Sequence, residues 1–158
     1  MLHISTEEQG DTTLVKFDGV IDEEAPLDAT AHMGFKKIVY DLQDLRGINS
    51  VGIKHWIAYT SKLRDAGTTM TFVNCPTIFI DQMALLPDFI PDWSTVKTFY
   101  APYVCDECAH EWEEIFAKED LAQTGYPERD CPECQAKGNV DDLADEFVLL
   151  AEKLGNAA

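Results

Sequence analysis

The sequence predicts an α/β fold with a small cysteine-rich insertion, and three observations lead to this prediction. Residues 37–74 contain a strand, an amphipathic helix and a second strand with short connections, which is the pattern of a βαβ unit. An alternating apolar and polar segment at residues 12–20 indicates an earlier strand. Four of the five cysteines form two C-x-x-C pairs. At 158 residues, 46% of them hydrophobic, the chain has room for one domain with a core and an appendage.

The first elements form a predicted hairpin. The segment TTLVKFDGV at residues 12–20 alternates and ends at Gly19, as a half-buried strand does. Residues 2–5 are a candidate partner strand across the turn EEQGD. The acidic stretch that follows is irregular and contains at best a short helix after Pro26.

The central strand–helix–strand unit begins with KIVYDL at residues 37–42, a β-branched run typical of a buried strand. A turn is expected at DLRG, and a helix follows from about residue 50, with Gly67 closing it. The segment TTMTFVN at residues 68–74 is the second buried strand. The spacing places one set of residues on the buried helix face: Ile53, Trp56, Ile57, Thr60 and Leu63.

The last third of the chain is predicted as a short helix, a strand, the cysteine segment and a final helix. The short helix covers residues 76–86 and stops at Pro87, and residues 94–104 form the strand. Apolar residues at spacings of three and four over residues 140–154 predict the final helix, with Asn139 as its N-cap. The expected domains are therefore residues 1–103, an insertion at 104–137 and a C-terminal helix at 138–158 that packs on the first domain.

The charge balance limits the classes of partner. Asp and Glu number 29 against 12 Lys and Arg, a formal net charge of −17. Such a surface repels phosphate backbones and anionic lipid, so we expect neither nucleic-acid nor membrane binding. No basic and apolar leader and no run of about 18 apolar residues occurs, so we expect a cytoplasmic protein. In that reducing compartment, paired cysteines favour metal binding or redox chemistry over disulfides.

The two C-x-x-C pairs predict one structural zinc ion held by a zinc ribbon. Each pair supplies half of a tetrahedral thiolate shell, and the ligands are expected to be Cys105, Cys108, Cys131 and Cys134. Four sulfur ligands close the site and leave no position for a catalytic water. Redox dithiols, iron and disulfides are the alternatives. His110 follows closely as a further candidate, but we interpret it as a loop histidine.

The composition around these pairs favours a protein interface or a scaffold over nucleic acid. Between the first and last of the four cysteines only Lys118 and Arg129 are basic, against ten acidic residues. Acidic neighbours raise the pKa of a thiol, which disfavours a redox enzyme. Cys75, alone after an apolar strand, is expected to be a small buried hydrophobic residue.

The segment KIVYDLQDLRGINSVGIKHWIAYTSKLRDAGTTMTFVNCP resembles the STAS domain family, which is named after sulfate transporters and anti-sigma factor antagonists. The resemblance lies in a buried strand, D-L, a turn, N-S-x-G opening a helix, and a second buried strand. It extends over about residues 2–100, and the helix after residue 139 is expected to complete the fold. It implies a mixed β-sheet backed by helices, no enzymatic activity and no catalytic residues. It also implies a protein partner such as an anti-sigma factor or a kinase-like regulator.

The same resemblance implies a candidate phosphorylation site at Ser50, at the start of the helix after the turn. A phosphate there would meet free backbone N–H groups and the positive end of the helix dipole. The alternative is that Ser50 only caps the helix. Asn49, Ser50, Lys54 and His55 are candidate partner-binding residues, with a solvated helix face as the alternative.

A cluster of apolar residues near Pro87 and Pro91 has two interpretations. It is either an exposed docking patch or packing beneath the insertion. Its members are Phe79, Met83, Phe89, Ile90 and Trp93.

The sequence therefore predicts a non-enzymatic protein–protein interaction module of STAS type with a structural zinc site, acting in bacterial regulation. The first alternative is a zinc-stabilised scaffold subunit without a phosphoswitch. A thiol redox protein that uses the C-x-x-C pairs is the second. The oligomeric state stays open.

Overall fold

The structure is a computed structural model that describes residues 1–31, 34–121 and 126–141. It divides into two compact units, Met1–Lys97 and Thr98–Ala158. The sequence placed a boundary at residue 103, but the structure divides the chain at Lys97 because the strand that follows belongs wholly to the second sheet. In the described parts of the chain, no helix is long and apolar enough to cross a membrane.

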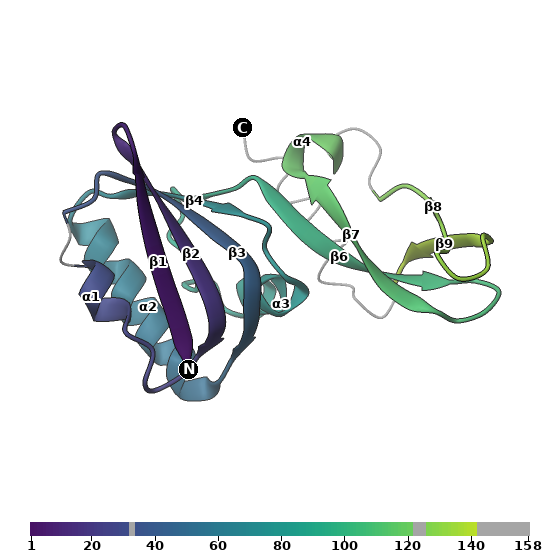
Figure 1. The fold of residues 1–158 in the computed structure, drawn as a ribbon, viewed down its shortest axis with the longest axis horizontal. Coiled ribbons are helices and arrows are strands. Elements are labelled where there is room, and N and C mark those ends of the chain that lie inside the picture. Colours follow the sequence, from purple (N-terminus) through teal and green to yellow (C-terminus); the bar gives the residue numbers. More distant parts are fainter. Residues whose placement is uncertain (32–33, 122–125, 142–158) are drawn as a thin grey trace. The chain divides into compact units, whose positions relative to one another are not determined.

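The first unit is built on a mixed five-stranded sheet in the order β1-β2-β3-β4-β5, of which Figure 1 labels β1 to β4. Strand β1 is antiparallel to β2, and every later neighbour is parallel. The register aligns Val15, Tyr40, Phe72 and Val96 across four strands, and all four side chains are buried. The strands are β1 (Leu2–Gln9), β2 (Thr12–Ile21), β3 (Lys37–Ile48), β4 (Thr69–Val73) and β5 (Thr95–Val96).

Helices cover the buried face of this sheet, so the predicted α/β fold with a mixed sheet backed by helices is confirmed. In Figure 1, α1 and α2 lie side by side on one side of β1 to β3. The helices are α1 (Leu27–Ala31), α2 (Ser50–Asp65) and α3 (Thr77–Leu85).

The core of the first unit is aromatic and centres on Trp56 of α2. Its ring centroid lies 5.9 Å from Tyr40, 6.0 Å from Phe17 and 5.8 Å from Phe79. The indole Nε1 donates a hydrogen bond of 2.7 Å to the carbonyl oxygen of Phe89. Offset and edge-on ring contacts of this kind add to the free energy gained by burying apolar area.

The buried face of α2 differs from the predicted face. Trp56, Thr60 and Leu63 are buried as expected, but Ile53 and Ile57 are only half-buried. Gly52 and Tyr59 take their places, and the structure buries this set: Gly52, Trp56, Tyr59, Thr60 and Leu63. The Tyr59 hydroxyl lies 2.7 Å from that of Tyr40, and this hydrogen bond satisfies the polar groups of both buried tyrosines.

Two further predictions for the first unit were that Gly67 closes α2 and that DLRG forms a turn, and only the first is confirmed. Gly67 has a φ of 77° and follows Ala66, the C-cap of α2, as predicted. The DLRG turn was wrong, because residues 44–47 lie within β3. There β3 pairs with β2 through two register shifts, and such irregularities bend a strand without ending it.

The second unit is an antiparallel sheet in the order β7-β6-β9-β8, with one short helix. The predicted strand at residues 94–104 is two strands, β5 in the first sheet and β6 in the second. The elements are β6 (Thr98–Cys105), β7 (Glu111–Ala117), α4 (Lys118–Leu121), β8 (Arg129–Asp130) and β9 (Lys137–Val140).

Strand β9 overturns the predicted start of the C-terminal helix. Asn139 pairs with Val104 and Val140 with Tyr103 in the β6–β9 ladder, so Asn139 is not a helix N-cap. Its side chain donates instead to Asp106, at 2.9 Å. The rest of the predicted helix, residues 142–154, lies outside the described residues.

A cluster of aromatic side chains packs together in the second unit. Phe116 packs against Tyr103 and Tyr126, with ring centroids 5.9 and 5.4 Å apart. Phe99 lies 6.4 Å from Phe116 and is fully buried. The Tyr103 hydroxyl donates a 2.6 Å hydrogen bond to the carbonyl of Pro127. The second unit thus has an apolar core that starts before the predicted insertion.

Candidate metal centre

The first cysteine knuckle lies at the turn from β6 to β7. Cys105 ends β6, and its backbone N–H donates to the carbonyl of His110 at 2.9 Å. Its carbonyl accepts from the N–H of Ala109 at 3.2 Å. Ala109 has a positive φ of 60°, which turns the chain sharply after Cys108. The tight turn brings both thiols of the pair to one side of the backbone.

The second knuckle, between β8 and β9, repeats the same hydrogen bonds. Cys131 donates from its N–H to the carbonyl of Ala136 at 2.7 Å and accepts at its carbonyl from Gln135 at 3.0 Å. Gln135 follows Cys134 with a φ of 66°, as Ala109 follows the first pair. The two pairs are therefore equivalent in backbone structure as well as in sequence spacing.

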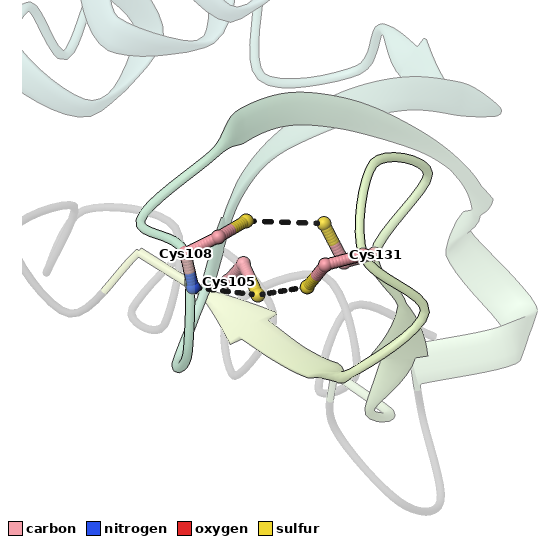
Figure 2. A group of neighbouring side chains, drawn as sticks. Cys105, Cys108 and Cys131 are labelled. Carbon is pink, nitrogen blue, oxygen red and sulfur yellow. Dashed lines mark hydrogen bonds between the residues drawn. The ribbon is translucent and has the colours of Figure 1, made fainter.

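The four sulfur atoms face one another, as Figure 2 shows for both pairs of contacts. Sγ of Cys105 lies 3.5 Å from that of Cys134, and Sγ of Cys108 lies 3.7 Å from that of Cys131. All four lie within 4.8 Å of one another, and all are free thiols. A tetrahedral ion with metal–sulfur bonds of ~2.3 Å would have sulfur–sulfur edges of about 3.8 Å. The cluster can therefore hold a metal ion.

Backbone N–H groups point at the sulfur of the first cysteine in each pair, Cys105 and Cys131. The N–H groups of Glu107 and Cys108 donate to Sγ of Cys105 at 3.4 and 3.5 Å, and Glu133 donates to Cys131 at 3.4 Å. The N–H of Cys108 is the main reason that the pKa of Cys105 falls to about 7. The acidic neighbours led us to expect raised thiol pKa values, so Cys105 departs from that expectation.

The two cysteines of each pair differ in burial. Cys105 and Cys131 are buried, whereas Cys108 and Cys134 are exposed. The N–H of Ala136 acts to lower the pKa of Cys134, but hydrogen bonds with neighbouring thiols outweigh it and raise that pKa to about 12. Four thiolates within 4.8 Å of one another would repel, and a bound metal ion would supply the positive charge that offsets this repulsion.

His110 is not part of this cluster of possible ligand atoms among the described residues. Its ring stacks on Trp112 with a centroid distance of 6.0 Å and an interplanar angle of 11°. Its backbone, by contrast, contributes to the first knuckle through the hydrogen bond from Cys105.

The second candidate site is the N-terminus of α2, where Asn49 rather than Ser50 is the N-cap. The Asn49 side chain accepts a 2.7 Å hydrogen bond from the N–H of Gly52. The interpretation of Ser50 as a cap is therefore wrong, because Ser50 is the first helical residue. Ser50 is exposed, as are Asn49, Lys54 and His55.

Sequence reasoning missed two residues that shape this helix end. Glu23, from the loop after β2, accepts a 3.0 Å hydrogen bond from the Asn49 side chain, which lowers the pKa of its carboxyl group. A Cβ atom on Gly52 would collide with the carbonyl oxygen of Ile21. The glycine of N-S-x-G is a signal from which close backbone approach could have been inferred, whereas no signal links Glu23 to Asn49, 26 residues away in the sequence.

The apolar cluster near Pro87 and Pro91 was expected to be either an exposed docking patch or packing beneath the insertion, and its members differ in burial. Phe79 and Phe89 are fully buried in the first unit, so they are core rather than docking residues. Trp93 is 41% exposed. Cys75 is fully buried as expected, and burial raises the pKa of its thiol.

No family model and no curated protein matches the chain, but solved structures do. An anti-sigma factor antagonist from Mycobacterium paratuberculosis is 22% identical, with a TM-score of 0.47 over 58% of this chain and 84% of that one. The anti-sigma factor antagonist SpoIIAA in its unphosphorylated form is 16% identical, with a TM-score of 0.44 over 60% and 87%. Mglu is 26% identical, with a TM-score of 0.39 over 43% of this chain and only 18% of Mglu. Identities this low transfer no function.

Proposed function

We propose that this chain is a non-enzymatic protein-interaction module of STAS type, acting in bacterial regulation in the cytoplasm, whose second unit is a zinc ribbon. The observation that carries the zinc assignment is the convergence of four free thiols within 4.8 Å. An all-sulfur tetrahedral site suits zinc or an iron–sulfur centre. Two equivalent knuckles that close the shell with protein ligands favour a structural zinc ion.

The interaction role is supported by the sequence resemblance together with the exposure of the α2 N-terminus. Asn49, Ser50, Lys54 and His55 form the proposed partner-binding surface, to which the structure adds Val51, a 42% exposed apolar residue. An apolar residue among polar and charged ones is a common composition for a transient interface. The partner of this surface is proposed to be an anti-sigma factor or a kinase-like regulator.

Metal content is the test of the zinc assignment. Untagged full-length protein would be analysed by elemental mass spectrometry, with thiol titration before and after chelation. We expect one zinc ion per chain and four additional reactive thiols after chelation, while Cys75 stays protected by burial. Iron instead of zinc, or a pair of disulfides, would reject the assignment.

The proposed partner surface is tested with two substitutions at Ser50. If Ser50 is a phosphoswitch, Ser50→Asp should weaken partner binding and Ser50→Ala should preserve it while preventing phosphorylation. Both side chains fit, because Ser50 is exposed and the cap belongs to Asn49. Glu7→Gln on β1 is a control for a surface charge change elsewhere.

The alternative of a zinc-stabilised scaffold without a phosphoswitch is favoured by one observation. The Glu23 carboxylate is hydrogen-bonded to Asn49, so negative charge already stands at this helix end. A phosphate on the adjacent Ser50 would have to share the helix N-terminus with it. Partner binding that is indifferent to both Ser50 substitutions would support the scaffold.

The thiol redox alternative has one favourable observation, the lowered pKa of Cys105. That sulfur, however, belongs to a buried residue, whereas an exchanging thiolate has to be reached by its substrate. Rapid labelling of Cys105 in zinc-loaded protein would support redox chemistry, and protection of all four thiols would reject it.

A further inference from the structure

A pocket of about 250 Å³ lies within the first unit, between α2 and the segment at residues 88–93. It uses α2 from Ile57 onwards, so it is separate from the helix N-terminus proposed above as a partner surface. It also lies outside the unit that contains the cysteine cluster. The residues that give it its chemical character are Ile57, Ser61, Arg64, Asp88, Asp92 and Trp93.

The loop wall of this pocket is anchored to the core. The buried indole of Trp56 donates its N–H to the carbonyl of Phe89 at 2.7 Å, and the Phe89 ring packs 5.0 Å from that of Phe79. The Ser94 side chain and backbone N–H both donate to the carbonyl of Pro91, at 2.6 and 3.0 Å. The wall is therefore held in place without a ligand, which lowers the entropic cost of binding one.

The charges of the pocket favour a cation. Asp88 and Asp92 both line it and are exposed, and neither has an ion-pair partner in the described parts of the chain. Arg64 is the one basic lining residue, and its Nε lies 3.7 Å from the carboxylate of Asp65. Two carboxylates outweigh one guanidinium, and the net charge of −17 adds a long-range attraction for cations.

The hydroxyl groups of the pocket also suit a hydrogen-bond donor. Thr60 and Ser61 each donate their hydroxyl hydrogen to the carbonyl of Ile57, at 3.1 and 2.8 Å. Their oxygen lone pairs therefore remain as acceptors.

The apolar part of the wall suits the stem of a long side chain. Trp93, 41% exposed, and Ile57 offer an aromatic and an aliphatic surface beside the carboxylates. An ammonium or guanidinium group near an indole gains a cation–π attraction, and its methylene stem gains apolar contact. The volume is below the roughly 300–1,000 Å³ of pockets for whole small-molecule ligands, and it suits one side chain.

We propose that this pocket binds a single lysine or arginine side chain presented by a basic segment of a partner protein. The head group pairs with Asp88 and Asp92, and the stem lies against Trp93. The proposal goes beyond the zinc site and the Ser50 surface, and it stands if either of those assignments fails.

The test uses the full-length protein and small probes of matched size, followed through the Trp93 indole N–H signal in ¹H–¹⁵N spectra. The cationic probes are the amides of N-acetyl-arginine and N-acetyl-lysine. The amide of N-acetyl-norleucine is the neutral control, and that of N-acetyl-glutamic acid is the anionic one. We expect the cationic probes to give saturable shifts that weaken with added salt, and the two controls to give none.

Substitutions then distinguish this site from general attraction to an acidic protein. The pair Asp88→Asn and Asp92→Asn should weaken cation binding about tenfold. The matched pair Glu7→Gln and Glu8→Gln on β1 changes the net charge equally and should leave binding unchanged. Arg64→Gln removes the competing cation and should strengthen binding, a gain that loss of folding cannot produce.

Three results would overturn the proposal. Equal weakening by the β1 pair would mean general electrostatic attraction without a site. Equal shifts with the norleucine probe would mean an apolar pocket indifferent to charge. Binding of the glutamic acid probe, lost in Arg64→Gln, would mean that the pocket is an anion site.

Discussion

Both units of this protein bury aromatic side chains, but only the second also buries thiols of a cysteine cluster. In the first, Trp56 is surrounded by rings from three strands and two other segments, and its single polar atom is satisfied by the Phe89 carbonyl. In the second, Cys105 and Cys131 are among the most buried side chains, and they face two exposed thiols. The stability gained by burying apolar side chains does not require a bound ion. The stability of a cluster of four sulfur atoms depends on a cation that offsets the negative charge of the thiolates. The first unit should therefore fold by itself, and the second should depend on a bound metal ion.

The largest expected effect is that of metal removal. Structural zinc supplies roughly 10–16 kcal/mol of apparent binding free energy in zinc-finger peptides at neutral pH. A chelator should therefore disorder the second unit while the first stays folded. The measurement is two-dimensional NMR of the full chain, with Trp112 reporting on the second unit and Trp56 on the first.

The chemical counterpart of chelation is Cys131→Ser, which removes one proposed ligand from a buried position. Cys75→Ala is the matched control, because it removes a fully buried thiol from the first unit and should leave metal content unchanged. If Trp112 kept its folded signal after complete metal loss, the aromatic cluster around Phe116 would be the true source of stability in the second unit.

The reverse experiment removes the core of the first unit. Trp56→Ala deletes a fully buried indole and its hydrogen bond to Phe89, so it should cost about 3–5 kcal/mol of unfolding free energy. Denaturant unfolding followed by signals from each unit should show loss in the first unit alone, with metal content unchanged. Simultaneous loss of both units would contradict their independence.

Alanine substitutions at one glycine in each unit test the independence of the two units with smaller expected losses of stability. A Cβ on Gly52 would collide with backbone at Ile21, which cannot move without shifting β2, so Gly52→Ala should cost about 3 kcal/mol. A Cβ on Gly138 would meet the Trp112 ring and also the backbone carbonyl oxygen of Val104 at 2.9 Å, so Gly138→Ala should cost about 2–3 kcal/mol. Thermal unfolding of each unit is the measurement. The prediction fails if either substitution destabilises the unit in which it does not lie.

The sequence predicted the first unit well because its signals are local. Alternation at residues 12–20, a β-branched run at residues 37–42 and a periodic helix between two strands each reflect the contacts of one element. The cysteine cluster was also predictable, since the spacing of each pair dictates its own knuckle. By contrast, the sequence did not predict that Gly52 and Tyr59, rather than Ile53 and Ile57, are buried. Their burial depends on the orientation in which α2 packs on the sheet.

Several of the predictions that failed depended on pairing between distant segments. The strand at residues 94–104 was continuous in hydrophobic pattern, yet its two parts pair with different sheets. Asn139 has the residue type of an N-cap, but pairing with Val104 places it in a strand. Likewise Glu23 reaches Asn49 only through the fold. Propensity is a weak prior, and tertiary pairing overrode it at each of these positions.

The smallest predicted effect concerns the buried hydroxyl pair of the first unit. Burial raises the pKa of Tyr40 well above its ordinary value, and its hydroxyl lies 2.7 Å from that of Tyr59. Tyr40→Phe removes one hydrogen bond and should cost about 1 kcal/mol at neutral pH. In the unfolded chain Tyr40 loses its proton near pH ~10, while the folded state keeps it.

The stability that this proton contributes is therefore fully present below pH ~10 and is lost as the pH rises towards the folded-state pKa of Tyr40. Tyr40→Phe should make the first unit less sensitive to alkali, although it is slightly less stable at neutral pH. Unfolding curves followed by Trp56 fluorescence between neutral and alkaline pH measure both effects, with Tyr100→Phe on β6 as the matched control in the other unit. An alkaline slope that Tyr40→Phe leaves unchanged would show that another group of the first unit governs it.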